Sequence, residues 1–160
     1  MLQPVCIEKT SMPARTEDVA TLDGIIKAFY EAISGPAGQP RQWERDRTLY
    51  APGALFVPTG VKAESGPFAI VMDHEAYRER SDSFLRGGFY EHEVHRVTHR
   101  FGNVAHVFST YEARQTPDGP VTIRGVNSIE LVYCSNRWWI LASLWDTERE
   151  GNPIPGYFLP

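Results

Sequence analysis

Polar side chains that can bind ligands or move protons recur along the second half of the chain, on segments whose alternating pattern predicts β-strands. One face of the predicted sheet carries, toward one end, His92, Arg96, Ser109, Tyr111, Asn127 and Asp146, with Tyr90 and Glu148 at its margin. Neighbouring strands lie about 4.8 Å apart, so these side chains can converge on one small molecule. The rest of this face is apolar, and an apolar cavity with a few convergent polar groups is typical of a ligand site.

These residue types can perform acid–base chemistry. A carboxylate held among Trp and Tyr side chains has a raised pKa, which suits Asp146 to proton transfer near neutral pH. Tyr111 and Asn127 can stabilise a developing oxyanion, and His92 can act as the partner acid or base. The predicted catalytic residues are Asp146, His92 and Tyr111. The predicted ligand-binding residues are Tyr90, Arg96, Ser109, Asn127 and Trp138.

A structural interpretation of the same residues stays open. Ser109 and Asn127 are residue types that satisfy buried backbone groups, and Asp146 can form a structural ion pair with Arg96. A bidentate pair between those two residues would favour the structural interpretation, whereas an inward-facing Asp146 without an arginine partner would favour catalysis.

Turn residues determine the pairing of the strands and therefore the face on which each side chain lies. Turns at 102–103, 117–119 and 135–136 separate predicted strands at 89–101, 104–115, 121–133 and 137–148. The middle turn predicts the pairs Ala105–Leu131, His106–Glu130, Val107–Ile129, Ser109–Asn127, Tyr111–Gly125 and Glu112–Arg124. Two of these pairs join opposite charges, which supports the register.

The outer turns extend this register to the other two strands. The last turn predicts the pairs Gly125–Asp146, Asn127–Leu144, Ile129–Ala142, Leu131–Ile140 and Tyr133–Trp138. The first turn predicts His92 near Ala113, Val94 beside Tyr111, Arg96 beside Ser109 and Thr98 beside Val107. A β-bulge in the strand 89–101 would instead turn His92 and Arg96 to the outer face.

Helical periodicity is typical of the first half of the chain. A helix is predicted over 16–34, because one of its faces carries Val19, Leu22, Ile26, Phe29 and Ile33. Further helices are predicted at 40–50 and 74–85, with short strands at 54–57 and 68–72. Helices followed by an antiparallel meander predict an α+β fold, with the helices packed on one face of the sheet.

Composition narrows the range of functions. The 160 residues predict a single domain over 1–160, with a core at about 16–148, an N-terminal extension at 1–15 and a C-terminal tail at 149–160. A net charge of −4 disfavours nucleic acids and membrane surfaces as partners. No apolar run is long enough to span a membrane, and the first 12 residues lack a signal-peptide pattern. With only Cys6 and Cys134 as cysteines, these features predict a cytoplasmic location.

The histidines lack the spacing of metal ligands. His92 and His95 point to opposite faces of one strand, and His95 and His99 lie about 13 Å apart. The sequence also contains no phosphate-binding loop and no dinucleotide-binding fingerprint. It therefore predicts no metal and no cofactor.

The opposite face of the predicted sheet is strongly apolar. It carries Phe108, Val126, Val132, Trp139, Leu141 and Trp145. A large apolar face on a soluble domain predicts a homodimer formed through it. The alternative is that the tail at 152–160, which contains Ile154, Tyr157, Phe158 and Leu159, covers this face.

Short motifs at both ends of the chain resemble one superfamily. Residues 29–32 (FYEA) and 50–56 (YAPGALF) resemble the opening of nuclear-transport-factor-2-like, SnoaL-like domains. Residues 137–140 (RWWI) resemble the closing strand of that superfamily, and the resemblance extends over about 16–148. It implies a cone-shaped α+β barrel, in which helices pack on a strongly curved antiparallel sheet of four long strands plus a short hairpin. It also implies a pocket between the sheet and the helices, and a dimer formed through the sheet.

The enzymes of this superfamily include ketosteroid isomerase, polyketide cyclases, scytalone dehydratase and limonene epoxide hydrolase. Asp146 and His92 are similar, by residue class, to the acid–base residues of the dehydratase and cyclase types. The set Arg96, Tyr111, Asn127 and Asp146 is similar to the water-activating arrangement of the epoxide hydrolase type, for which Glu148 would be the second carboxylate. No catalytic signature of these enzymes matches the sequence residue by residue.

Two hypotheses follow. In the first, the chain is a cofactor-free acid–base enzyme (an isomerase, dehydratase, cyclase or hydrolase) that acts on a small and largely apolar molecule. In the second, it is a non-catalytic domain that binds a ligand or associates as a dimer. The first hypothesis predicts a small-molecule substrate in the pocket, but a fold of this kind does not by itself imply catalysis.

Overall fold

The computed structural model describes residue 7 and residues 13–160. Its helices are α1 (Thr16–Val19), α2 (Leu22–Ile33), α3 (Trp43–Arg47), α4 (His74–Leu85) and the 3-10 helix η1 (Gly156–Phe158). Its strands are β1 (Tyr50–Lys62), β2 (Gly66–Ala69), β3 (Tyr90–Phe101), β4 (Val104–Arg114), β5 (Val121–Cys134) and β6 (Arg137–Thr147). Cys6 and most of the predicted extension at 1–15 lie outside the described residues. Within the described part, no helix is long and apolar enough to cross a membrane.

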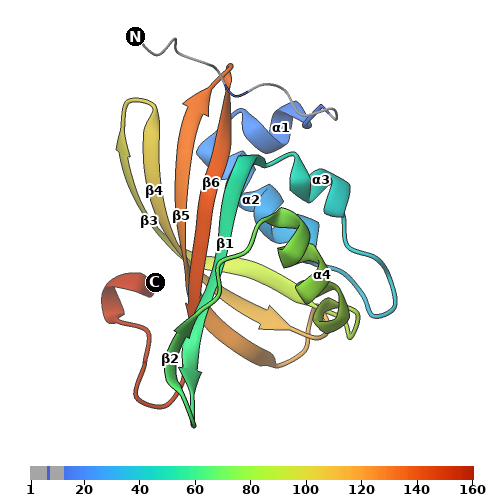
Figure 1. Ribbon diagram of the computed structural model, residues 1–160, viewed down its shortest axis with the longest axis vertical. Coiled ribbons are helices and arrows are strands. Elements are labelled where there is room, and N and C mark those ends of the chain that lie inside the picture. The colour runs from blue at the N-terminus through green and yellow to red at the C-terminus, as the bar shows by residue number, and fades with distance from the viewer. Residues whose placement is uncertain (1–6, 8–12) are drawn as a thin grey trace.

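One curved sheet carries the helices on a single face. Its strand order is β2-β1-β6-β5-β4-β3, and the two edge strands do not join to close a barrel. Figure 1 shows the helices on one side of the sheet and the C-terminal segment with η1 on the other. These features confirm the predicted α+β fold. Strands β3–β6 form the predicted antiparallel sheet of four long strands, and β1 forms the predicted short hairpin with β2. Strand β1 also joins this hairpin to the sheet by running parallel to β6.

The predicted helix over 16–34 is divided into α1 and α2 at Thr21. The backbone of Thr21 is extended, and its side chain accepts a hydrogen bond from the Gly24 amide at 2.9 Å. This N-cap satisfies an amide that has no partner within the first turn of α2. The predicted apolar face is still the buried one, since Ile26 and Phe29 are at most 7% exposed.

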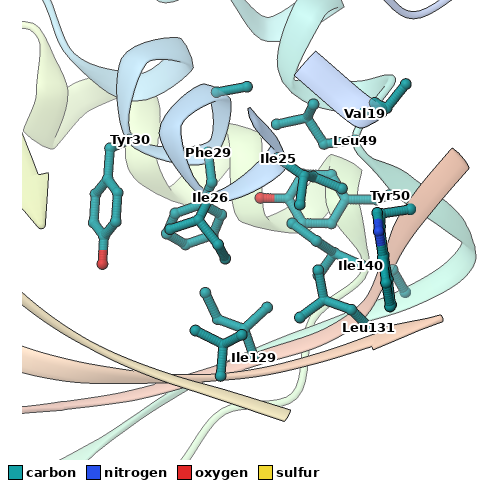
Figure 2. Close-up of a cluster of buried hydrophobic side chains, with 14 of the residues drawn as sticks. Val19, Ile25, Ile26, Phe29, Tyr30, Leu49, Tyr50, Ile129, Leu131 and Ile140 are labelled. Atoms are coloured by element: carbon teal, nitrogen blue, oxygen red, sulfur yellow. The ribbon is translucent and has the colours of Figure 1, made fainter. Parts of the chain in front are cut away.

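The main hydrophobic core lies between α2 and the sheet. Figure 2 shows Ile25, Ile26 and Phe29 facing the strand residues Ile129, Leu131 and Ile140. Burial of each such side chain stabilises the fold by roughly 1.5–3 kcal/mol, so this contact determines which face of the sheet is the inner one.

The register between β4 and β5 agrees with the prediction at every predicted pair. Ser109 lies opposite Asn127, and Tyr111 lies opposite Gly125. The oppositely charged pair of Glu112 and Arg124 lies on the outer face, as expected. The centre of the inner face is therefore confirmed.

A β-bulge at Leu141 changes the face of the residues that follow it in β6. Leu131 pairs with Ile140 as predicted, but the next pair is Glu130 with Ala142, which leaves Leu141 as the extra residue. The predicted pairs Ile129–Ala142, Asn127–Leu144 and Gly125–Asp146 are therefore wrong, and the observed pairs are Ile129–Ser143, Asn127–Trp145 and Gly125–Thr147. A bulge inserts one residue, so it exchanges the two faces of the strand beyond it.

A second β-bulge, at Val94, has the same effect on the first half of β3. Arg96 pairs with Ser109 as predicted, but Glu93 instead of Val94 lies opposite Tyr111. The predicted place of His92 near Ala113 is also wrong, since that place is taken by Glu91 and His92 lies opposite Glu112. The bulge therefore turns His92 to the outer face and brings Glu91 to the inner face, while Arg96 stays on the inner face.

The outer face of the sheet is partly covered by the C-terminal tail. The Phe158 ring contacts the Phe108 ring at a centroid distance of 4.9 Å, and the Thr110 hydroxyl donates to the Phe158 carbonyl at 2.6 Å. Trp145 is not part of this face, because the bulge at Leu141 turns it inward. The tail therefore shields part of the surface from which the homodimer was predicted.

Helix α4 is held against α3 by a buried contact between His74 and Asp46, and against β1 by an aromatic stack. His74 Nε2 lies 2.8 Å from Asp46 Oδ2, and the Asp46 side chain is fully buried. Burial raises the pKa of Asp46, and the hydrogen bond from His74 opposes this effect. Farther along the helix, the Tyr77 ring stacks on the Phe56 ring at 4.4 Å.

Because a buried carboxylate without its partner is strongly destabilising, we expect His74→Ala to lower the free energy of unfolding by about 3 kcal/mol. Arg47→Ala is the matched control, since it removes an ion pair with Glu75 whose side chains are 57% and 47% exposed. Exposed pairs contribute about 1 kcal/mol or less. Chemical denaturation followed by tryptophan fluorescence measures both losses, and equal losses would contradict the anchoring role of Asp46 and His74.

Candidate functional site

A cavity of about 140 Å³ lies between α2, α4 and the inner face of the sheet. Its lining residues are Phe29, Ile33, Phe56, Tyr77, Ser81, Phe84, Leu85, Phe89, Glu91, Tyr111, Asn127, Ser143 and Trp145. The walls are mostly aromatic and aliphatic, and the polar lining groups come from the sheet and from Tyr77 and Ser81 of α4. Such a cavity suits a small molecule with a large apolar part and one polar end.

The cavity has polar groups that can interact with that polar end. Glu91 is the carboxylate among its lining residues, and Tyr111, Asn127 and Ser143 line it from neighbouring strands. The Ser143 side chain is 1% exposed, and its Oγ has no hydrogen-bond partner among the described residues. A buried hydroxyl without a partner costs free energy, so Ser143 is a candidate ligand-binding group.

The apolar surroundings change the proton affinity of Glu91. Burial raises its pKa from the ordinary 4.5 to about 8, and a hydrogen bond from Asn127 opposes this effect. The pKa of Tyr111 is raised as well, mainly by burial and to a smaller extent by the negative charges of Glu91 and Asp146. Glu91 can therefore take up or release a proton near neutral pH, whereas Tyr111 stays a neutral hydrogen-bond donor.

The structure brings Tyr111 and Asn127 into the cavity, but it does not place Asp146 there. Asp146 pairs with Val126 on the outer face and forms two contacts with Arg149, at 2.5 and 3.1 Å. Burial raises the pKa of Asp146, but the hydrogen bonds from Arg149 and the Thr147 amide outweigh it, so that this pKa lies below its ordinary value. The expected inward position of Asp146 is therefore wrong, because the bulge at Leu141 turned it away.

The other predicted site residues do not line the cavity. His92 is exposed on the outer face, where Arg114 Nη1 lies 3.2 Å from its ring nitrogens. Trp138 packs in the core beneath Arg100, whose guanidinium lies 5.0 Å from the indole ring. Tyr90 is half-buried and does not line the cavity.

Arg96 and Ser109 lie on the inner face behind the cavity. Arg96 forms ion pairs with Glu93 at 2.7 Å and with Asp23 at 2.6 Å. Ser109 is fully buried and contacts Tyr30, with 2.7 Å between the two hydroxyl oxygens. Glu148, at the margin of the predicted site, pairs with Arg124 at 3.2 Å.

Comparison with known proteins identifies the fold. No family model matches the sequence, and no curated protein matches it. A Mycobacterium tuberculosis protein of unknown function is 18% identical, with a TM-score of 0.54 over 68% of this chain and 61% of that chain. Yeast BRE5, a UBP3-associated protein, is 13% identical, with a TM-score of 0.56 over 79% and 92%. A putative dehydratase of the NTF2-like family from Streptomyces avermitilis is 13% identical, with a TM-score of 0.54 over 76% and 90%.

The chain has the nuclear-transport-factor-2-like fold. The resemblance read from residues 29–32, 50–56 and 137–140 is thus confirmed for the fold. Since the chain spans less than two thirds of the Mycobacterium protein and identity is low throughout, these similarities assign no residue roles. Those roles have to be inferred from the cavity itself.

Glu91, Ser143 and Trp145 are among the cavity residues that sequence reasoning missed. All three are on the inner face because of the two bulges. The run of residues 90–93 (YEHE) contains acidic and basic residues at alternating positions, so a shift by one residue decides whether histidine or glutamate faces inward. No three His, Cys, Asp or Glu side chains in the described part of the chain gather closely enough to hold a metal ion.

The close contact of Gly125 with Tyr111 provides a test of the cavity. A Cβ atom at Gly125 would lie 2.5 Å from the Tyr111 hydroxyl and 2.5 Å from the Asp146 carbonyl oxygen. We expect Gly125→Ala to displace Tyr111, to cost roughly 1–3 kcal/mol of stability and to weaken binding of any ligand in the cavity. Gly156→Ala is the control, because a Cβ there meets nothing within 4 Å. Thermal unfolding with and without ligand measures both effects, and a Gly125→Ala protein that matches this control would contradict the packing.

Proposed function

We propose that the chain is an enzyme that transfers a proton to or from a small, largely apolar carbonyl compound, with Glu91 as the acid–base group. The observation that supports this proposal most strongly is the carboxyl group of Glu91 in an aromatic cavity that also contains the hydroxyl groups of Tyr111 and Ser143. A carboxyl group in such surroundings exchanges protons at neutral pH, as general acid–base catalysis requires.

The proposed reaction begins with ionised Glu91. Tyr111 and Ser143 donate hydrogen bonds to the substrate carbonyl oxygen, and Glu91 removes a proton from the carbon next to that carbonyl. The electron pair of the broken C–H bond forms an enolate, whose negative charge lies on the oxygen that the two hydroxyls hold. In a β,γ-unsaturated substrate, protonated Glu91 returns the proton to the γ-carbon of the dienolate, which is an isomerisation. In a β-hydroxy substrate, the enolate electron pair forms a C=C bond as the C–O bond breaks, and Glu91 protonates the departing hydroxyl group to water, which is a dehydration.

The aromatic walls favour an uncharged substrate. Phe29, Phe56 and Phe89 line the cavity, and none of its lining residues is a lysine or arginine. An anionic group would lose its hydration without gaining an opposite charge, which is unfavourable. Since the Streptomyces structure of the same fold is described as a putative dehydratase, a dehydration fits the fold as well as an isomerisation does.

A direct test is loss of proton transfer in Glu91→Gln, which keeps the shape of the side chain but removes the base. We expect carbonyl compounds that raise the melting temperature to exchange hydrogen for deuterium next to the carbonyl in D₂O. This exchange should fall at least about 100-fold in Glu91→Gln. The rate in the wild-type protein should rise with pH through about 8, because the base must be ionised.

The control for this experiment is Glu112→Gln, which changes a carboxyl on the outer face of the neighbouring strand. We expect it to exchange at the wild-type rate. Proton NMR of the substrate measures all three proteins. Wild-type exchange in Glu91→Gln would contradict the proposed role of Glu91, and ligand binding without any exchange would favour the non-catalytic alternative.

The raised pKa of Glu91 also predicts how stability depends on pH. The folded protein binds this proton more tightly than the unfolded chain, so the free energy of unfolding falls as pH rises from about 4.5 to about 8. The loss amounts to a few kcal/mol at most, since one pKa unit corresponds to ~1.4 kcal/mol. Denaturant unfolding across this pH range should show a smaller decline in Glu91→Gln than in wild type. Parallel curves for the two proteins would contradict a raised pKa.

A homodimer through the outer face and a cytoplasmic location stay predictions. Leu55, Leu141 and Leu144 are 38–44% exposed, and they support a homodimer that uses the part of the sheet surface not covered by the tail. Sedimentation analysis of the purified protein measures the oligomeric state.

A further inference from the structure

A chain of hydrogen bonds runs from the cavity into α2 and back to β3. The Asn127 side-chain amide donates to the Tyr30 hydroxyl at 3.1 Å. The Tyr30 and Ser109 hydroxyl oxygens lie 2.7 Å apart. Ser109 Oγ in turn donates to a carboxylate oxygen of Glu93. Figure 2 shows the Tyr30 side chain extending from α2 toward the strands.

The direction of every hydrogen bond in this chain is determined by its last member. Glu93 forms an ion pair with Arg96, whose nitrogens lie 2.7–3.0 Å from its carboxylate oxygens. A carboxylate only accepts, so Ser109 must donate its single proton to Glu93. Ser109 therefore accepts from Tyr30, and the Tyr30 oxygen is left as the acceptor that faces Asn127.

The orientation of the Asn127 amide follows from this direction. A side-chain amide has a donor end and an acceptor end, and rotation by 180° exchanges them. The Tyr30 oxygen accepts, so it selects the donor NH₂ end of Asn127. The same NH₂ group has a second proton, and Asn127 lines the same cavity as Glu91, whose pKa it lowers.

We propose that Tyr30, Ser109 and Glu93 are positioning residues that hold the Asn127 amide with its NH₂ group toward Glu91. Without these hydrogen bonds the side-chain amide of Asn127 can rotate by 180°, and its oxygen would then face the carboxylate of Glu91. The ionised form of Glu91, which the proposed function needs as its base, would lose a donor. The catalytic consequence rests on the proposed function, whereas the orientation itself does not.

Other groups face Glu91 from each element around it, and none of them replaces Asn127. The hydroxyl-bearing rings of Tyr30 from α2, Tyr50 from β1, Tyr77 from α4 and Tyr111 from β4 lie near enough to respond to its charge. Glu93 follows on the same strand and is neutralised by Arg96. Among the described groups that affect the pKa of Glu91, Asn127 is the one that lowers it, so Asn127 favours the ionised form.

The test is the titration of the Glu91 carboxyl carbon, followed by NMR of ¹³C-labelled protein and assigned by its absence in Glu91→Gln. Tyr30→Phe keeps the aromatic ring but removes the hydroxyl group that links Asn127 to Ser109 by hydrogen bonds. We expect the midpoint to move upward by about one pH unit, as for loss of one hydrogen bond to a charged group. Ser109→Ala interrupts the series of hydrogen bonds at the next residue without changing an aromatic ring. It should move the titration midpoint of Glu91 in the same direction.

The matched control is Tyr50→Phe. Tyr50 is also buried beside the same core, but its hydroxyl donates to Asp46 at 3.5 Å and is outside the chain. We expect the Glu91 midpoint to stay at the wild-type value in this variant. Midpoints that do not move in Tyr30→Phe and Ser109→Ala, or that move equally in Tyr50→Phe, would overturn the proposal.

Activity separates this proposal from the proposed function. If Glu91 is the base, exchange by Tyr30→Phe near neutral pH should fall about tenfold and recover at higher pH, because one pH unit in the midpoint changes the ionised fraction tenfold. A moved midpoint with unchanged exchange would support the positioning chain and contradict Glu91 as the base. An unchanged titration midpoint of Glu91 would contradict the positioning role of Tyr30, Ser109 and Glu93, whatever the activity of the protein.

Discussion

Side chains alternate along a β-strand, so one inserted residue exchanges the inner and outer faces of everything beyond it. The candidate site depends on two such insertions. The bulge at Val94 brings Glu91 to the inner face in place of His92, and the bulge at Leu141 brings Ser143 and Trp145 inward in place of Asp146. Both occur beside the β4–β5 pair, whose register is regular across the cavity. Because β4 and β5 are in regular register and the flanking strands β3 and β6 are each bulged, Glu91 is the carboxyl group that faces the cavity.

That carboxyl group is costly to keep in an apolar cavity, and the surrounding structure limits the cost without removing it. Burial raises the pKa of Glu91 to about 8, and Asn127 provides one hydrogen bond to the ionised form. Asp146 and Glu93, by contrast, form ion pairs with Arg149 and Arg96. The fold therefore contains carboxylates with structural partners and one carboxyl group that can change its protonation state near neutral pH.

Much of the fold was predictable from the sequence, but the identity of the acid–base residue was not. Helical periodicity, Asp73 as the N-cap of α4 and the turn residues between strands are local signals, and α4 and the β4–β5 register agree with them. A bulge depends on how a strand bends over its neighbours, and no local signal marks Val94 or Leu141 as the extra residue. Tyr111 and Asn127 were found because the β4–β5 register is regular around them, whereas the two bulges displaced Asp146 and His92 by a single position each.

The central claim is that Glu91 faces the cavity and carries a proton at mildly acidic pH. Infrared spectroscopy tests it most directly, because a carboxylic acid and a carboxylate absorb at different frequencies. At about pH 6, below the expected pKa of about 8, the wild-type protein should show a carboxylic-acid C=O band that is absent from Glu91→Gln. Identical spectra for the two proteins in this region would show that Glu91 is already ionised, and would contradict the account.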